Sequence, residues 1–261
     1  VDINAVNNVV VVLVEPAGPL NIGSVARLCA NFNVEELRLV APRCDHLSEP
    51  SLQMAVHGRE MLHSAKLYPT LLSAIGDCRR SVASCGRIDH GAIPLHSPTD
   101  ALTWLLARPT PEPHQPGPIA VVFGREDRGL SNDELRLCQR VLTLHSGSDY
   151  PSLNLSHSVG IVLHDMARLS TKLHIPSTAD PSAKPAQLPS PDPAAAPALT
   201  ALLDDATDLL LEAGFLLQHT AHARMGKVRD LLQRATVRTE EVALIRGMVR
   251  QLRWAIRSHR P

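Results

Sequence analysis

Hydrophobic residues in the first two thirds of the chain fall into two alternating patterns. Five short apolar runs, rich in β-branched residues, have the composition of strands buried on both faces, and segments with helical spacing lie between them. Ser131 and Glu134 fit a capping box, which predicts a helix start there. The alternation predicts an α/β fold with a mostly parallel sheet and helices on both faces. The predicted strands are 9–14, 37–40, 81–84, 119–123 and 141–144, and the helices are 22–32, 70–76, 99–106, 133–140 and 155–169.

The composition of the chain changes near residue 173. Seven of the 22 residues at 176–197 are proline, mixed with Ala and Ser, and such a segment favours extended chain without a core. Apolar residues then recur with helical spacing at 199–214 and 227–257, and those of the second segment include Leu231 and Leu252. We therefore expect a domain at 1–172, a Pro/Ala-rich linker at 173–198 and a small helical domain at 199–261.

Basic and acidic residues balance at 26 each, so the net charge gives no reason to expect a polyanionic partner. Their distribution along the chain is uneven. Ten Lys or Arg residues lie from Arg224 to the end, against Asp230, Glu240 and Glu241. A solvated helix face and a nucleic-acid-binding surface both account for this basic segment.

The cysteines, histidines and apolar runs argue against several classes of protein. The five cysteines form no C-x-x-C pair, which favours a reduced, cytoplasmic chain without structural zinc. His145, His157 and His164 lack ligand spacing, so we expect no metal. No apolar run approaches the roughly 20 residues that span a bilayer, and residues 1–15 lack the basic start of a signal peptide.

Three segments place polar residues where a predicted strand ends and a helix begins, which is where open α/β sheets bind ligands. No G-x-G-x-x-G or P-loop sequence occurs, so nicotinamide and nucleoside-triphosphate sites are not indicated. The three segments are 15–27 with Asn21 and Arg27, 123–130 with Glu126, and 150–156 with Ser152 and Asn154.

Each of these segments also has a purely structural interpretation. Asn21 is then a helix cap, and Arg27, which lies off the apolar face of its helix, is a solvated side chain. The charged turn around Glu126 is a surface loop with an ion pair. Ser152 and Asn154 are caps of the last helix of the domain.

Taken together and in this order, the three segments resemble motifs 1, 2 and 3 of the SPOUT superfamily of RNA methyltransferases, in its 2′-O-ribose (SpoU) branch. The resemblance is carried by Asn21 with Arg27, by F-G-R-E-D-R-G-L-S at 123–131 and by S-L-N-L-S at 152–156. It spans about residues 9–170. Any one motif is weak evidence, whereas the ordered trio is specific.

Two further segments qualify the resemblance. The tail, at 212–215 and 240–247, is similar to the helical extension of bacterial members that methylate ribose in the anticodon loop of tRNA. The run Ala-Ser-Cys-Gly-Arg at 83–87 departs from the Thr-Thr-Ala-Arg-like run of related enzymes.

The resemblance implies a trefoil knot in the C-terminal part of the sheet domain, which no periodicity predicts because knots are almost absent from proteins. The knot loops are expected to bind S-adenosylmethionine, mostly through backbone groups and without a metal. The implied cofactor-binding residues are Ser84, Cys85, Gly86, Gly124, Leu144, Pro151, Ser152 and Leu153.

The resemblance also implies a catalytic set and two partners. Arg27 is expected to orient the ribose 2′-hydroxyl and to stabilise the developing alkoxide, since a guanidinium stays protonated and is a poor general base. A homodimer is expected because family members complete the site with the second subunit. The basic tail is expected to bind tRNA phosphates. The implied catalytic residues are Arg27, Asn21, Glu126, Ser152 and Asn154, with Glu126 holding Arg27 or the cofactor amino group.

The sequence therefore predicts S-adenosylmethionine-dependent 2′-O-methylation of a ribose in tRNA, at the anticodon-loop nucleotide 32, a cytidine or uridine. Two alternatives stay open. One is an RNA-binding protein that has lost catalysis, which cofactor binding would exclude. The other is a ribosomal RNA methyltransferase, in which the added domain is more often N-terminal than C-terminal.

Overall fold

The computed structural model of the chain describes residues 8–86, 93–107, 117–144, 146, 152–174 and 192–258. The chain divides into two compact units, Val1–Ser190 and Pro191–Pro261, and each is described by itself. Most of the predicted Pro/Ala-rich linker falls on residues outside the described ranges.

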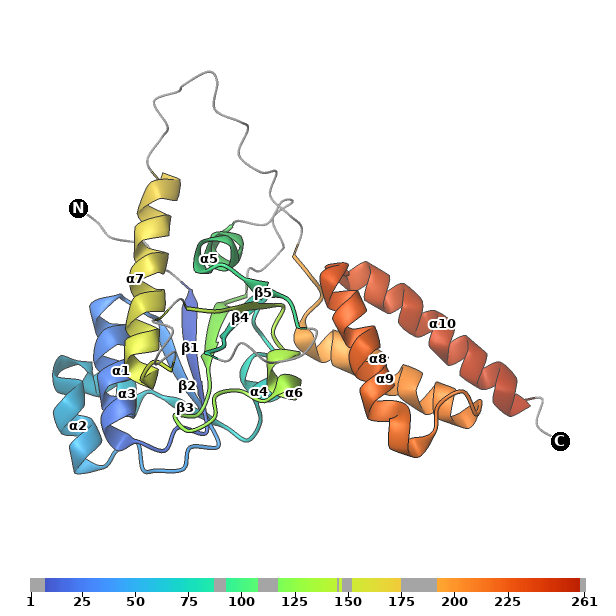
Figure 1. The fold of residues 1–261 in the computed structure, drawn as a ribbon, viewed down its shortest axis with the longest axis horizontal. Helices are drawn as coiled ribbons and strands as arrows, with labels where there is room; N and C mark the ends of the chain where they lie inside the picture. Colours follow the sequence, from blue (N-terminus) through green and yellow to red (C-terminus); the bar gives the residue numbers. More distant parts are fainter. Residues whose placement is uncertain are drawn as a thin grey trace, which may run out of the picture. The chain divides into compact units, whose positions relative to one another are not determined.

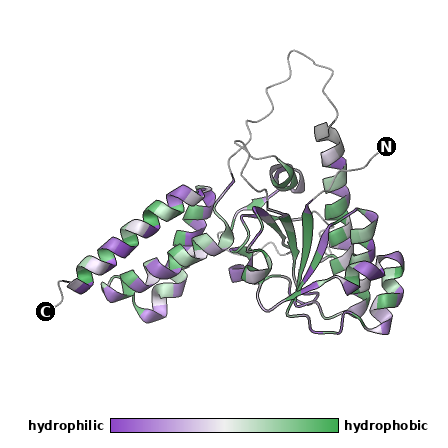
Figure 2. Ribbon diagram, turned by 180° about the vertical axis from the view of Figure 1, so that it is seen from behind, coloured by the Kyte–Doolittle hydropathy of each residue, from purple (hydrophilic) through white to green (hydrophobic). Residues whose placement is uncertain are grey.

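The first unit is built on a sheet in which each described pairing is parallel, as predicted (Figure 1). The strand order is β3-β2-β1-β6-β4-β7-β5. The two central strands β1 and β6 are buried along their whole length, because their residues are apolar on both faces. Figure 2 shows these strands as almost uniformly hydrophobic. The strands are β1 (Val9–Val14), β2 (Glu36–Val40), β3 (Lys66–Tyr68), β4 (Arg80–Ser84), β5 (Leu95–His96), β6 (Ile119–Phe123) and β7 (Arg140–Leu142).

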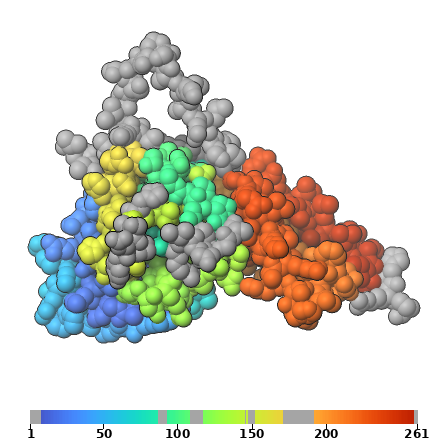
Figure 3. All heavy atoms as spheres, in the orientation of Figure 1, coloured from blue at the N-terminus to red at the C-terminus, as the bar shows by residue number. Residues whose placement is uncertain are grey.

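Helices lie on both sides of this sheet (Figure 1). Alternate residues of β1, namely Val9, Val11 and Leu13, pack in one core with apolar residues of α1, α5 and α7. The helices α1 and α7 lie side by side, although one opens the unit and the other closes it (Figure 3). The helical elements are α1 (Pro19–Asn31), α2 (Glu49–Ala55), η1 (Val56–Gly58), α3 (Arg59–His63), α4 (Leu71–Ala74), α5 (Pro98–Leu106), α6 (Asn132–Leu135) and α7 (Leu155–His174).

Each of the five predicted strands is present, but the structure adds elements that the sequence pattern did not reveal. These are the short edge strands β3 and β5 and the helices α2 and α3. The capping box is confirmed: the Ser131 hydroxyl accepts from the Glu134 backbone N–H at 3.2 Å, and the Glu134 carboxylate accepts from the Ser131 N–H at 2.7 Å. The helix predicted at 133–140 is shorter than expected, since β7 begins at Arg140. The trefoil knot stays a prediction.

The second unit consists, in its described part, of α8 (Ala196–Glu212), α9 (Gln218–Arg234) and α10 (Thr239–Ser258). The single helix predicted at 227–257 is therefore wrong. The chain breaks at Thr236, whose φ of 52° lies in the left-handed region and ends α9. Two of the apolar residues that mark this helical spacing are exposed, Leu231 by 55% and Leu252 by 56%.

Candidate active site

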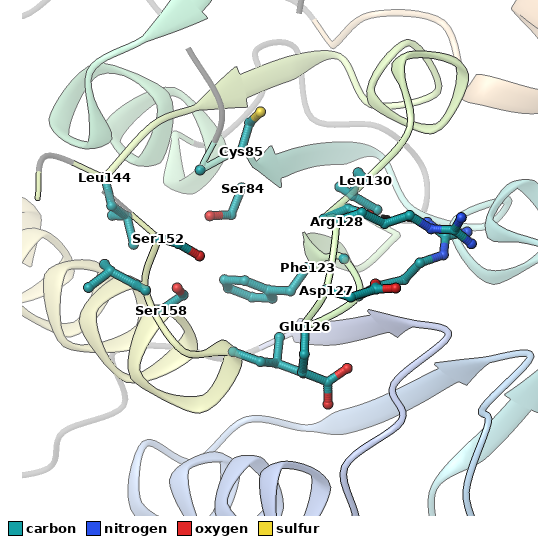
Figure 4. A pocket seen from close by; sticks show the side chains of 16 residues that line it. Ser84, Cys85, Phe123, Glu126, Asp127, Arg128, Leu130, Leu144, Ser152 and Ser158 are labelled. Carbon is teal, nitrogen blue, oxygen red and sulfur yellow. Dashed lines mark hydrogen bonds between the residues drawn. The ribbon is translucent and has the colours of Figure 1, made fainter. Parts of the chain in front are cut away.

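A pocket of about 560 Å³ opens at the carboxyl ends of the central strands (Figure 4). Its walls come from the ends of β4 and β6, from the segment after β7 and from the start of α7. This is the edge at which open parallel sheets bind their ligands. The lining residues are Ser84, Cys85, Gly86, Phe123, Gly124, Arg125, Glu126, Asp127, Arg128, Gly129, Leu130, Leu144, Ser152, Leu153, Leu155 and Ser158.

Seven of the eight residues expected to bind the cofactor line this pocket, and Pro151 lies outside the described residues. The run at 83–87, which differs from the corresponding run of related enzymes, therefore still contributes Ser84, Cys85 and Gly86 to the pocket wall. Sequence reasoning missed several lining residues that are neighbours of expected ones. Ser158 could have been found, because it lies one helical turn after Asn154 on α7.

The pocket combines apolar walls with hydroxyl groups and with charged residues of the motif 2 loop. The ring of Phe123 and the hydroxyls of Ser84, Ser152 and Ser158 point toward the same space, whereas Arg128 extends away from it (Figure 4). A cleft with both apolar and polar walls suits a ligand that carries both a flat ring and polar substituents.

Two glycines, Gly124 and Gly86, shape the backbone of the pocket. A Cβ at Gly124 would lie 2.3 Å from the Gly129 carbonyl carbon and the Leu130 nitrogen, so the tight turn of motif 2 accepts no side chain there. A Cβ at Gly86 would meet nothing within 4 Å. The backbone near Gly86 is therefore open to a ligand.

A chain of hydrogen bonds joins the three motifs. The Asn21 side-chain amide donates to the Glu126 carboxylate at 3.0 Å, and the Asn154 amide donates to the Asn21 side-chain oxygen at 3.0 Å. The Glu126 carboxylate also accepts from the backbone N–H groups of Gly18 at 3.0 Å and Ala17 at 3.1 Å. Glu126 thus holds the entry to α1 against the motif 2 loop.

The charge of Glu126 is stabilised where it lies. Burial acts to raise the pKa of this carboxyl, but the hydrogen bonds from Asn21, Ala17 and Gly18 outweigh burial and lower the pKa below its ordinary value. Two of the interpretations considered from the sequence, a surface ion pair and a contact with Arg27, are not found within the described residues. The partners of Glu126 are motif 1 groups instead.

The interpretation of Asn21 as a helix cap is wrong. The cap position of α1 is Gly18, and Asn21 lies inside the first turn, with its side chain directed to Glu126 and Asn154. Asn154 does act as a cap, since its side-chain oxygen accepts from the backbone N–H groups of Ser156 at 2.9 Å and His157 at 3.4 Å. Asn154 therefore both starts α7 and ties it to α1.

A second network fixes the motif 2 loop. The Arg125 guanidinium is bound by both oxygens of Glu134 at 2.9 Å and by the carboxylate of Glu15, which also pairs with Arg43. Glu15 has a φ of 46°, so the strand end adopts a strained conformation that places this carboxylate beside Arg125. The hydrogen bond from Arg125 outweighs burial and, with Arg43, lowers the pKa of Glu15 to about 2.

Arg27 stands apart from this cluster. It lies on the exposed side of α1 and does not line the pocket of its own chain. Within the described residues its side chain has no hydrogen bond or ion pair. The structure therefore brings Asn21, Glu126, Ser152 and Asn154 to one place and leaves Arg27 outside it.

The described residues contain no group of three or more His, Cys, Asp or Glu side chains arranged to hold a metal ion. They also contain no helix that is long and apolar enough to cross a membrane.

Comparisons with known proteins agree on one family. The sequence profile of the SpoU rRNA methylase family matches residues 8–164. The tRNA (cytidine-2′-O-)-methyltransferase TrmJ of Methanocaldococcus jannaschii is 36% identical over 160 residues, which are 60% of this chain and 66% of that protein. The tRNA (cytidine/uridine-2′-O-)-methyltransferase TrmJ of Klebsiella pneumoniae is 29% identical over 244 residues, 93% of this chain and 95% of that one.

A solved structure agrees with these sequence relatives. The crystal structure of TrmJ from Z. mobilis ZM4 superposes with a TM-score of 0.75 at 25% identity. The alignment covers 93% of this chain and 98% of that one, so it includes helices of the second unit.

Proposed function

Since the chain belongs to the SpoU rRNA methylase family, we propose that it methylates the 2′-hydroxyl of a ribose in tRNA, at the cytidine or uridine of position 32. The chain is an RNA methyltransferase, and S-adenosylmethionine is its methyl donor. The choice of tRNA is supported by the relatives that carry tRNA in their names and that match over 93% of this chain. Family membership is the observation that carries the proposal.

The pocket residues suit S-adenosylmethionine. Phe123, Leu130 and Leu153 offer apolar surface for the adenine, and the hydroxyls of Ser84 and Ser152 offer hydrogen bonds to ribose or amino-acid groups. When bound, S-adenosylmethionine would supply a methyl group on a sulfonium, which the ribose 2′-oxygen can take by displacement without a metal. The 2′-hydroxyl proton would be released to water, and the neutral thioether of S-adenosylhomocysteine would be the leaving group.

We assign Arg27 to the ribose. A guanidinium stays protonated at all working pH values, so Arg27 can donate hydrogen bonds to the 2′-oxygen and stabilise negative charge on it. The Arg27 side chain is exposed and has no partner within the described residues, so it is available to bind a ligand. Asn21, Glu126 and Asn154 are then positioning residues, which fix α1 relative to the cofactor pocket.

A homodimer explains how Arg27 meets a pocket that it does not line. The exposed surface of α1 and α7 carries apolar side chains, among them Leu20, 53% exposed, and Ile161, 41% exposed. Packing of these helices against a second copy would bury that surface and bring Arg27 of one protomer to the pocket of its partner. The trefoil knot is part of the same proposal, since the pocket walls are the loops that it would tie.

The proposed function is tested by methyl transfer from S-adenosylmethionine to purified RNA, with ribose methylation mapped by position. tRNA from cells lacking this protein should accept methyl groups at nucleotide 32, and ribosomal RNA from the same cells should not. Arg27→Ala should lower turnover by orders of magnitude with nearly unchanged cofactor affinity. Arg59→Ala, at an exposed arginine on α3, is the matched control. Methylation of ribosomal RNA alone, or normal turnover of Arg27→Ala, would contradict the proposal.

A further inference from the structure

The positive charge of the second unit is divided between α9 and α10, and the two helices differ in how that charge is compensated. The four arginines of α10 lie beside acidic residues of α8. Arg246 bonds to Asp205 at 2.6 Å, and Arg253 pairs with Glu212. The remaining pairs are Arg250–Asp205 at 3.8 Å, Arg253–Asp208 at 3.3 Å and Arg257–Glu212 at 2.7 Å. α10 therefore presents little uncompensated positive charge.

Three of the basic residues of α9, namely Arg224, Lys227 and Arg234, have no acidic partner of this kind within the described residues. Its four basic residues are Arg224, Lys227, Arg229 and Arg234, and its one acidic residue, Asp230, is buried. Lys227 and Arg234 have no hydrogen bond or ion pair within the described residues, and Arg224 donates to the carbonyl of Phe215 at 3.3 Å. The excess positive charge of the tail therefore lies on α9.

These cations share one side of the helix. Lys227 and Arg234 are seven residues apart, so they lie two turns from each other, about 10 Å, on nearly the same face. That face is away from Ala221 and Met225, which are buried against the core of the unit. Leu231 lies between the two cations and is 55% exposed.

We infer that this face of α9, formed by Arg224, Lys227, Leu231 and Arg234, is the RNA-binding surface of the second unit and that α10 is not. The cations match the phosphates of a nucleic-acid backbone, and the exposed Leu231 offers an apolar contact to a ribose or base. The inference rests on the proposed function, because it takes RNA as the substrate. It narrows the expectation that the basic tail binds phosphates to one helix of that tail.

The test compares two double variants of the full chain that each remove two positive charges. Lys227→Gln with Arg234→Gln changes α9, and Arg250→Gln with Arg257→Gln changes α10 at side chains that are 66% and 60% exposed. The dissociation constant for tRNA is measured from about 50 to 200 mM salt. The α9 pair should weaken binding about tenfold and lower the slope of log Kd against log salt by about 1.4 to 2, while the α10 pair should change neither by more than about twofold.

Three controls make the result decisive. Lys227→Arg with Arg234→Lys should keep the affinity of the unmodified chain, since phosphate contacts need charge alone. S-adenosylmethionine binding and thermal unfolding should show that each variant is folded.

Equal losses of tRNA affinity for both Gln pairs would overturn the inference in favour of an effect of net charge. Normal tRNA affinity of the α9 pair, in an enzyme that still methylates tRNA, would overturn it and leave the proposed function standing. Failure of the unmodified chain to bind or methylate tRNA would instead overturn the proposed function and this inference with it.

Discussion

The side-chain amide of Asn21 donates a hydrogen bond of 3.0 Å to the carboxylate of Glu126, although 105 positions of sequence separate the two residues. The same carboxylate accepts two backbone N–H groups at the start of α1. Such contacts to an ionised acceptor are stronger than neutral hydrogen bonds. The geometry of the first helix therefore depends on an acid in the motif 2 loop.

We predict that Glu126→Gln weakens both the fold and the pocket. A neutral amide cannot accept as strongly from Ala17, Gly18 and Asn21, so the free energy of unfolding should fall by about 1–3 kcal/mol. Cofactor affinity should fall about tenfold, because the motif 2 loop loses its anchor. Urea unfolding of the free protein and calorimetric titration with S-adenosylmethionine measure the two effects. Glu60→Gln, at an exposed acid on α3 that does not line the pocket, should change neither value, and an equal loss there would contradict the role of Glu126.

The Glu15 carboxylate should make stability depend on acid pH. Its pKa is lowered from 4.5 to about 2, so its contribution is fully present above pH 4.5 and is lost as the pH falls toward 2. Glu15→Gln should therefore cost roughly 1 kcal/mol at pH 7, after allowing for solvent screening, and nothing near pH 2. Unfolding free energies measured between pH 2 and 7 test this difference. For Glu60→Gln, at an exposed acid outside the network, the unfolding free energy should change with pH as it does in the unmodified protein. If the difference in unfolding free energy between Glu15→Gln and the unmodified protein were the same at every pH, the proposed dependence on the Glu15 charge would be refuted.

Gly124→Ala should abolish cofactor binding while Gly86→Ala leaves the fold intact. The new methyl at 124 would lie 2.3 Å from two backbone atoms of the motif 2 turn, so the turn must open. At 86 the methyl meets nothing within 4 Å. Thermal unfolding and cofactor titration separate the two variants. Unchanged cofactor affinity for Gly124→Ala would show that the turn is not part of the site.

Mixed dimers should reveal which pocket Arg27 serves. Arg27→Ala and Gly124→Ala are each expected to be inactive alone. In a hybrid of the two, an Arg27 that serves the partner subunit meets the one intact pocket, and roughly half of the normal activity should return, because one of the two sites is complete. Co-expression with two affinity tags isolates the hybrid. Inactive hybrids of normal cofactor affinity would place Arg27 with its own pocket.

The sequence predicted the central strands and the pocket far better than the edges of the sheet. β1 and β6 are apolar throughout, which is the pattern of a strand covered on both faces. β3 and β5 have only three and two residues and are half or fully exposed, so no periodicity identifies them. The break at Thr236 was missed for a related reason, since neither glycine nor proline marks that turn.

The identity of the pocket residues was predictable, but their partners were not. Gly124, Leu144 and Ser152 were expected from the family resemblance, and all three line the pocket. The hydrogen bonds that link Asn21 to Glu126 and Asn154 depend on side-chain directions at two strand ends, and these directions emerge only when the sheet is assembled. The compensation of the α10 arginines likewise depends on how α8 packs beside them.

The walls of the pocket are supplied by stretches that begin at Ser84 and finish at Ser158. During synthesis the ribosome must therefore release the chain past the first turn of α7 before the pocket is complete, and the contacts that close the site are distant in sequence. Loading with the methyl donor becomes a late step of maturation. A ribosome-stalled fragment that ends before α7 should accordingly not bind S-adenosylmethionine, even where its first strands have already paired.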